Sequence, residues 1–211
     1  MTPRPYTPVQ RQKAVDEGRE RILAAARELL EVEDAERFSL DAVARRAGVS
    51  RMTVYNQFES KAKLLEALFD SLAARGPISM MKDEVFAVQD PIAALDAFVA
   101  LFGRFWTYSR RAHGRLRAAT TDDPELAAAL HGRNERRRAA VTELVRRLEP
   151  HVTPVVPRGE LANVLYVMLG FDSFDAIAGP ARTPNDAVPI VRALAHAVLG
   201  IKAKRVRPKK R

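Results

Sequence analysis

The chain contains no cysteine, a single tryptophan and only 10 glycines among its 211 residues. Without cysteine, it cannot form disulfides, a cysteine-based zinc finger or a thiol redox sensor, and it suits a reducing compartment. No apolar run approaches the roughly 20 residues of a membrane span. The first residues, MTPRPYTPVQRQK, lack the apolar core of a signal peptide. These absences predict a cytoplasmic protein without a membrane partner.

Signatures of catalysis are missing as well. The sequence has no GxSxG, P-loop, GxGxxG or HExxH motif. Its histidines do not have metal-ligand spacing: His113, His131, His151 and His196. We therefore expect no enzymatic activity, no metal and no cofactor.

The net charge of +9 is concentrated at the end of the sequence. The last ten residues, KAKRVRPKKR, hold seven cations and no acid, so without them the net charge falls to +2. We expect residues 204–211 to be a basic tail that either attracts phosphates or only aids solubility. Residues 1–16 hold Arg4, Arg11 and Lys13 among prolines, which predicts a flexible arm able to lie along DNA.

Residues 39–61 are typical of two short helices joined by a glycine turn. The apolar residues of the first helix recur at i, i+3, i+4 and i+7, as Leu40, Val43, Ala44 and Ala47. Ser39 stands where an N-cap oxygen is needed, and Gly48 suits the left-handed backbone of a sharp reversal. The pattern predicts a helix-turn-helix.

The second helix, capped by Ser50, has distinct inward and outward sides. Val54 and Phe58 are four residues apart and face inward together. The outward side gathers the side chains that suit DNA, namely Arg51, Met52, Thr53, Tyr55 and Asn56. Asparagine pairs with adenine, a Thr or Met methyl meets the thymine methyl, and arginine reaches phosphate or guanine. Each residue alone is compatible with an ordinary solvated helix face. The combination of these residues with two capped helices joined by a glycine turn favours DNA binding.

The segment AGVSRMTVYNQFESKAKLL resembles the DNA-binding domain of the tetracycline-repressor (TetR) family. In that family a Gly-Val-Ser turn leads to a Tyr-x-x-Phe recognition helix, and a Ser-Lys pair opens a fourth helix. An amphipathic segment upstream fits the family's first helix, with apolar residues Ile22, Leu23, Ala26, Leu29 and Leu30. The resemblance covers about the first third of the chain.

The resemblance also implies which residues approach DNA, with Tyr55 and Lys61 on phosphates. With Ser50 and Met52 added from the helix pattern, the predicted DNA-binding residues are Ser39, Ser50, Arg51, Met52, Thr53, Tyr55, Asn56 and Lys61. Met52 replaces a small residue that is common at its position, and Gln57 replaces a frequent histidine. We therefore expect the base sequence read here to differ from that of better-known relatives.

The rest of the chain predicts helices and no strands, so the expected fold is all-α. The fourth helix should end at Gly76, and further helices are expected at about 91–110, 124–149, 158–178 and 185–203. This organisation predicts a flexible arm at 1–16, a three-helix DNA-binding domain at 17–62, a ligand-binding and dimerisation domain at 63–203, and the tail at 204–211.

The last two helices have broad apolar faces. We predict a homodimer interface at Leu161, Leu165, Met168, Val191, Leu194 and Val198. The alternative is that these residues complete the core of one subunit, and helical periodicity does not separate the two. The resemblance implies a four-helix bundle between two subunits, and two-fold symmetry would let one small motif read a longer site.

The resemblance further implies a cavity for a small-molecule effector whose binding releases DNA. The candidate lining residues are Phe102, Phe105, Trp106, His113, His131, Asn134, Tyr166 and Asp172. An aromatic stripe at helical spacing is also typical of a plain core. Asp172 stands out because a buried carboxylate would need a cationic or hydrogen-bonding partner.

The sequence thus predicts a ligand-responsive repressor that binds a pseudo-palindromic, double-stranded DNA operator as a homodimer, with an unknown effector. A non-catalytic helical adaptor that uses the basic tail to touch nucleic acid is the alternative.

Overall fold

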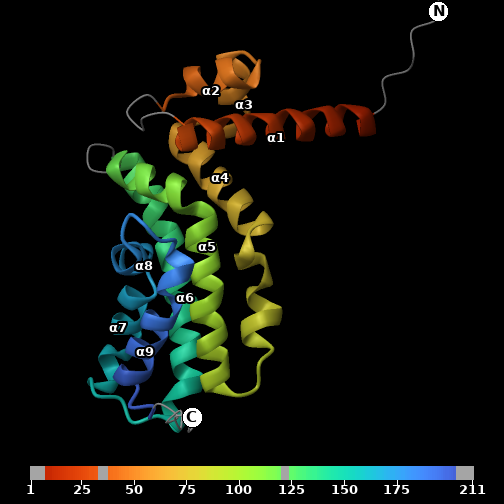
Figure 1. Cartoon of the computed structure of the whole chain (residues 1–211). Helices are drawn as coiled ribbons and strands as arrows, with labels where there is room; N and C mark the ends of the chain where they lie inside the picture. The colour runs from red at the N-terminus through yellow and green to blue at the C-terminus, as the bar shows by residue number, and fades with distance from the viewer. Residues whose placement is uncertain (1–7, 33–37, 120–123, 203–211) are drawn as a thin grey trace, which may run out of the picture. The chain divides into compact units, whose positions relative to one another are not determined.

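The computed structural model describes residues 8–32, 38–119 and 124–202 (Figure 1). Within these residues the chain is helical and has no strand, which confirms the all-α prediction. The expected tail at 204–211 and the first seven residues of the expected arm lie outside the described part. The chain divides into two compact units, Met1–Leu72 with Arg111–Gly132, and Ala73–Arg110 with Arg133–Arg211.

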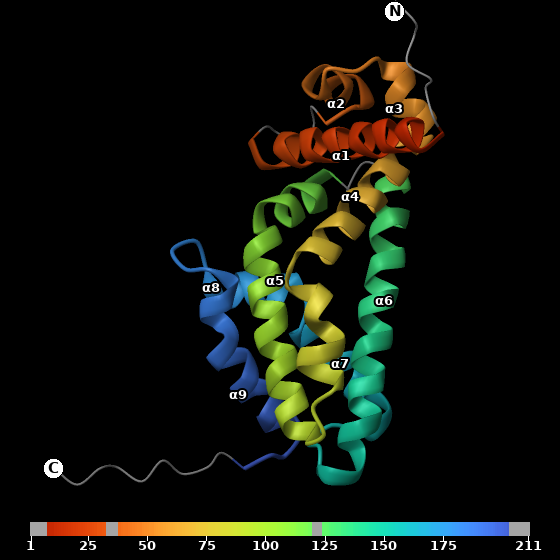
Figure 2. The ribbon, with the colours of Figure 1, turned by 90° about the vertical axis from the view of Figure 1, so that its right-hand side faces the viewer.

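The first unit contains the helix-turn-helix. Its helices are α1 (Pro8–Val32), α2 (Leu40–Ala47), α3 (Arg51–Phe58) and most of α4 (Lys61–Arg75). Helices α2 and α3 lie on the same side of α1 (Figures 1 and 2). Helix α4 buries one apolar face, at Leu64, Leu65, Leu68, Phe69 and Leu72.

Helix α1 is longer than expected. It begins at Pro8, so residues 8–16 are helical and do not belong to a flexible arm. Proline is tolerated in the first turn because an N–H at that place would have no partner within the helix. The turn that follows is supported by a hydrogen bond from Gln12 Nε2 to Asp16 Oδ1, 2.9 Å long, between residues four apart.

The second unit packs five helices, within the described residues, around one apolar core. They are parts of α5 (Pro91–Ala119) and α6 (Pro124–Leu148), with α7 (Leu161–Met168), α8 (Phe171–Ala178) and α9 (Val188–Val198). Short turns join them, namely η2 (Pro77–Met80), η3 (Lys82–Phe86), η4 (Glu149–His151), η5 (Arg158–Glu160) and η6 (Pro184–Ala187). Fully buried members of the core come from every helix, among them Leu95, Phe98, Leu144, Leu165, Phe174 and Val191.

The boundaries of several helices differ from the sequence-based expectation. Helix α5 does not end near Arg110 but continues to Ala119. The last helix is shorter than 185–203, because residues 184–187 form the turn η6 and the helix ends at Val198. Among the described residues no single helix is long and apolar enough to cross a membrane; only the pair Arg158–Met168 and Phe171–Ala178, bent by 55°, passes that test together.

The single helix predicted for 158–178 is wrong, because the chain breaks at Gly170. Gly170 has an extended backbone, and three carbonyl oxygens around the break accept hydrogen bonds from side chains. Trp106 Nε1 donates to Leu169 O at 3.2 Å, Arg137 Nη1 donates to Tyr166 O at 2.6 Å, and Ser173 Oγ donates to Val167 O at 2.7 Å. These donors satisfy carbonyls at a helix end that would otherwise be costly to bury.

Candidate nucleic-acid interface

Helix α2 starts and stops as its sequence predicts. Ser39 is the N-cap, and its Oγ accepts a hydrogen bond from Ala42 N at 3.1 Å. Gly48 ends the helix with φ 65° and ψ 36°, the left-handed region that glycine adopts at little cost. Val43 and Ala44 are buried, so one face of the helix is fixed against the rest of the unit.

Helix α3 is anchored on one side and exposed on the other. Ser50 caps it, with its Oγ accepting from Thr53 N at 3.0 Å. Val54 and Phe58 are buried, as predicted. On the opposite side Met52 is 64% exposed and Tyr55 is 54% exposed, although both have large apolar surfaces. Together they offer a contact surface to a binding partner.

The remaining outward residues of α3 are polar. Arg51 and Asn56 are exposed, and Thr53 is half-buried. The hydroxyl of Thr53 lies 2.8 Å from Ser50 Oγ, so it is already engaged at the helix N-terminus. Asn56 presents an exposed amide on this face, which can pair with a base edge.

Arg51 forms an ion pair across the turn. Its Nε lies 3.4 Å from Asp41 Oδ1 in the first turn of α2, and both side chains are substantially exposed. A pair of this kind contributes little in water. A DNA phosphate can therefore take the place of Asp41 as the partner of the guanidinium.

The junction between α3 and α4 has an unusual backbone. Glu59 is the only non-glycine residue with positive φ among the described residues, at φ 61° and ψ −40°. Ser60 N donates to Phe58 O at 2.6 Å across it, which makes a tight γ-turn. Glu59 also pairs with Lys63, and its hydrogen bond raises the pKa of the Lys63 ammonium. The turn ends α3 and places Lys61 at the start of α4, with its Nζ 6.0 Å from the centroid of the Phe38 ring.

Helix α1 braces the end of α3, which the sequence did not reveal. Arg19 Nη1 donates to Gln57 O at 3.2 Å, and its guanidinium lies 4.3 Å from the centroid of the Phe58 ring. Gln57 Nε2 in turn donates to Val15 O at 3.4 Å. A signal was present in the spacing, because Arg19 stands four residues before the buried Leu23 and so on the inward face of α1.

The predicted effector residues fall in both units. Phe102, Phe105 and Trp106 are nearly fully buried in the core of the second unit, where their rings contact one another. His113 belongs to the first unit and meets the Phe69 ring edge-on, with centroids 5.1 Å apart.

The polar candidates are mostly on the surface. His131, Asn134 and Asp172 are exposed, so the expectation of a buried Asp172 is wrong. Asp175, three residues further on, forms an ion pair, with its Oδ1 2.7 Å from Arg110 Nε. Tyr166 is half-buried, with the Arg137 and Arg138 guanidinium carbons 3.9 and 4.1 Å from its ring centroid. Burial lowers the pKa of Arg137.

The predicted dimer residues divide between the core and the surface. Leu161, Leu165 and Val191 are fully buried within the subunit, so they cannot touch a partner directly. Met168 and Val198 are half-buried, and Leu194 is 47% exposed. Two large apolar residues that the prediction omitted are also exposed on these helices, Val167 at 65% and Ile190 at 43%.

No metal site accompanies these features in the part of the chain that is described. There, no group of three or more His, Asp or Glu side chains is placed to hold a metal ion.

Comparisons with known proteins agree with this geometry. The sequence profile of bacterial regulatory proteins of the tetR family matches residues 22–68, which run from the second half of α1 into α4. The nucleoid occlusion factor SlmA of Marinomonas sp. (strain MWYL1) is 28% identical over 155 residues, 74% of each chain. The HTH-type transcriptional regulator AlkX of Mycobacterium tuberculosis (strain H37Rv) is 28% identical over 181 residues, 86% of this chain and 72% of the other.

A solved structure shares the fold. NalD, the secondary repressor of the MexAB-OprM multidrug efflux pump in Pseudomonas aeruginosa, superposes with a TM-score of 0.66. The match covers 88% of this chain and 98% of NalD. Because the sequence identity is only 20%, the match shows a shared fold and nothing more. The similarity therefore extends beyond the helix-turn-helix into the second unit.

Proposed function

Because the chain belongs to the tetR family of DNA-binding bacterial regulators, we propose that it is a repressor that binds a pseudo-palindromic operator as a homodimer and leaves it when a small effector binds. The role requires no catalysis, and it places the protein in the cytoplasm with the chromosome. In this proposal residues 17–62 read DNA, and residues 63–203 dimerise and respond to the effector.

One observation carries the proposal. Helix α3 is fixed from behind by Val54 and Phe58 while Met52 and Tyr55 stay exposed beside Asn56 on its outer side. This combination suits a helix that enters a major groove, because apolar side chains can contact thymine methyls there and an amide can pair with adenine.

The homodimer is supported by the exposed apolar residues of α7 and α9. Val167, Ile190 and Leu194 are each more than 40% exposed. Ala193 and Ala197 are exposed beside them on α9 and would let a second helix approach closely. We define these five residues as the dimer face. The buried Leu161, Leu165 and Val191 support this face from inside the subunit.

The effector part of the proposal makes a thermodynamic demand. An effector releases DNA only if it binds the DNA-incompetent arrangement more tightly, typically by about 1–3 kcal/mol of coupling, and DNA must weaken effector binding by the same factor. We propose α4 as the coupling element, because this helix starts at Lys61 and continues past the boundary of the second unit at Ala73.

Titration tests the effector part. A compound that co-purifies with the protein and is identified by native mass spectrometry would be titrated against the protein alone and against the protein on its operator. We expect a lower affinity on the operator. Equal affinities would show that the compound is not an inducer.

Electrophoretic mobility shift tests the DNA-binding part. A complex on genomic fragments that survives excess sheared competitor DNA at rising salt supports the regulator. Weak binding that disappears when residues 204–211 are deleted would support the helical adaptor instead. Mapping of bound sites in cells separates a further possibility, because a few sites upstream of genes favour a repressor, and many dispersed sites would favour nucleoid occlusion, the role in the name of SlmA.

A further inference from the structure

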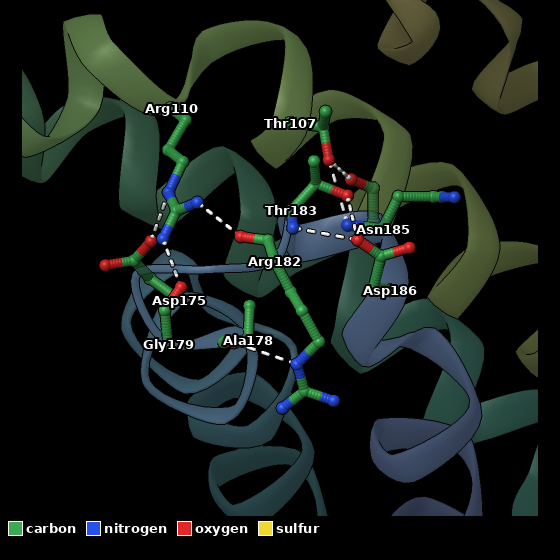
Figure 3. Close-up of polar contacts among 10 residues, drawn as sticks. Thr107, Arg110, Asp175, Ala178, Gly179, Arg182, Thr183, Asn185 and Asp186 are labelled. Carbon is green, nitrogen blue, oxygen red and sulfur yellow. Dashed lines mark hydrogen bonds and ion pairs between the residues drawn. The ribbon is translucent and has the colours of Figure 1, made fainter.

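Arg110 of α5 holds the connection between α8 and α9 with three hydrogen bonds (Figure 3). Its Nε donates to Asp175 Oδ1 at 2.7 Å, its Nη2 to Gly179 O at 2.9 Å, and its Nη1 to Arg182 O at 2.6 Å. The partners lie 65 to 72 residues further along the sequence. A planar guanidinium with donors in a fixed fork imposes direction as well as proximity on its partners. We call these three bonds the Arg110 anchor.

Further contacts with the same segment come from the same face of α5. The backbone N–H of Asn185 donates to Thr107 Oγ1 at 2.9 Å. Gly103 makes room for the start of α9, because a Cβ there would lie 2.3 Å from Val188 Cγ2 and 3.4 Å from Asn185 Cα. Residues 103, 107 and 110 are spaced i, i+4 and i+7, so they form one stripe along the helix.

The stripe continues toward the start of α5. Asp96 stands seven residues before Gly103, and its Oδ1 lies 2.7 Å from His196 Nε2 and 3.6 Å from Arg192 Nε. Both partners belong to α9. Polar contacts therefore tie the last turns of α9 to α5. The Arg110 anchor holds the segment that leads into the first turn of α9.

The connection itself is a rigid piece of structure. Arg182 closes the end of α8 by donating from Nε to Ala178 O at 3.0 Å and from Nη2 to Ile177 O at 2.6 Å. Asp186 Oδ2 accepts from Thr183 N at 2.8 Å and from Thr183 Oγ1 at 2.7 Å, and these bonds lower the pKa of Asp186. A displacement of the connection would therefore be passed on to α9, which begins at Val188.

The α9 part of the dimer face begins soon after this connection. Ile190 is the third residue of α9, and Leu194 follows one turn later. Val191 and Ala195, with Leu199 just past the helix end, bury the other side of α9 in the core, and this burial sets which face of α9 is outward. The polar contacts near the two ends of α9 add directional restraints on its rotation and sliding.

We propose that Arg110 is a positioning residue for homodimerisation, which holds the α8–α9 connection so that Ile190 and Leu194 face the partner subunit. The partner is a second copy of this chain, so the inference rests on the proposed homodimer. Arg110 itself does not touch the partner. Its role is to set the geometry of a surface that begins eight residues after its last acceptor, Arg182.

Sedimentation equilibrium of the full chain tests the proposal with Arg110→Met. The matched control is Arg104→Met, which removes an exposed arginine of the same helix that pairs with Glu84 and has no bond to the connection. We expect the dimer dissociation constant to rise about tenfold in Arg110→Met and to stay within twofold of the wild type in the control. Arg110→Lys, which keeps the charge but not the fork, should fall between them. An unchanged dissociation constant in Arg110→Met would overturn the proposal, even if the melting temperature falls.

A distance measurement covers the case in which Arg110→Met does not fold. The chain has no cysteine, so Ala181→Cys introduces a single label site, at an exposed residue of the connection. Arg110→Lys keeps the charge but cannot make the forked set of bonds to the connection. We expect the label-to-label distance across the dimer, measured by pulsed electron resonance, to broaden in Arg110→Lys. An unchanged narrow distribution would overturn the proposal, whereas a monomeric wild type would overturn the proposed homodimer as well.

Discussion

Arg19 Nη1 donates a hydrogen bond to the carbonyl oxygen of Gln57, 3.2 Å away, and so joins α1 to the last turn of the helix we assign to the DNA groove. The same guanidinium lies over the Phe58 ring. We expect Arg19→Met to lower the unfolding free energy by about 1–2 kcal/mol, because it removes a charged hydrogen bond and a cation–π contact. Urea unfolding measures this loss, and DNA affinity should fall in parallel.

Arg21→Met is the matched control for that prediction. Arg21 lies on the same helix as Arg19 and is also an arginine, but its side chain is exposed. Its substitution should leave stability and DNA binding close to the wild type. If Arg19→Met and Arg21→Met behave alike, α1 does not brace the recognition helix.

The outward residues of α3 should differ in what they contribute. We expect Asn56→Ala to cost about 1–3 kcal/mol on the preferred site and to relax preference at one base pair, because an amide reads a base edge. Lys61→Ala and Tyr55→Phe should weaken binding to all sequences by similar factors, as phosphate contacts do. Fluorescence anisotropy with a set of single-base operator variants distinguishes the two patterns. An Asn56→Ala variant with unaltered preference would remove Asn56 from base reading.

Glu59 occupies a backbone conformation that L-residues avoid. At φ 61° and ψ −40° its backbone is strained, whereas glycine adopts this conformation at little energetic cost. We expect Glu59→Gly to be more stable than Glu59→Ala by about 1 kcal/mol, since both remove the contact with Lys63 and only glycine relieves the backbone. Thermal unfolding of the two variants compares them directly. An alanine variant as stable as the glycine variant would mean that the turn relaxes in solution.

Gly200 should tolerate no side chain. Its φ is +68°, and a Cβ would lie 2.1 Å from the backbone oxygen of Thr153. We expect Gly200→Ala to destabilise the protein by at least about 2 kcal/mol, from strain and overlap together. Gly132→Ala is the control, because Gly132 lies within α6 with open space around it, and alanine there should stabilise the helix by up to about 1 kcal/mol. Chemical denaturation that ranks Gly200→Ala with the wild type would refute the close contact.

The helix-turn-helix was predictable because its signals are local. The cap Ser39, the turn Gly48 and the four-residue spacing of Val54 and Phe58 act within one or two helical turns, and the structure bears out each of them. The brace from Arg19 was not predictable in the same way, because its partner Gln57 lies 38 residues away.

The second unit was harder to predict because its decisive contacts are distant in sequence. The break at Gly170 is supported by Arg137 from α6 and Trp106 from α5, and the segment before it, 161–169, is largely apolar. The helical periodicity predicted apolar faces on the last two helices. It could not distinguish residues buried within the subunit, such as Leu161 and Leu165, from residues at a dimer interface. The pairing of Asp175 likewise depends on Arg110, which lies 65 residues earlier in the sequence.

Selection of bound sequences from random double-stranded DNA tests the central claim most directly. A homodimer with one recognition helix in each subunit predicts an enriched pseudo-palindrome whose half-sites are about one helical turn, or a multiple of it, apart. Asn56→Ala should then change the preference at the same position in both half-sites. Enrichment of a single asymmetric half-site, or of no sequence at all, would contradict the account.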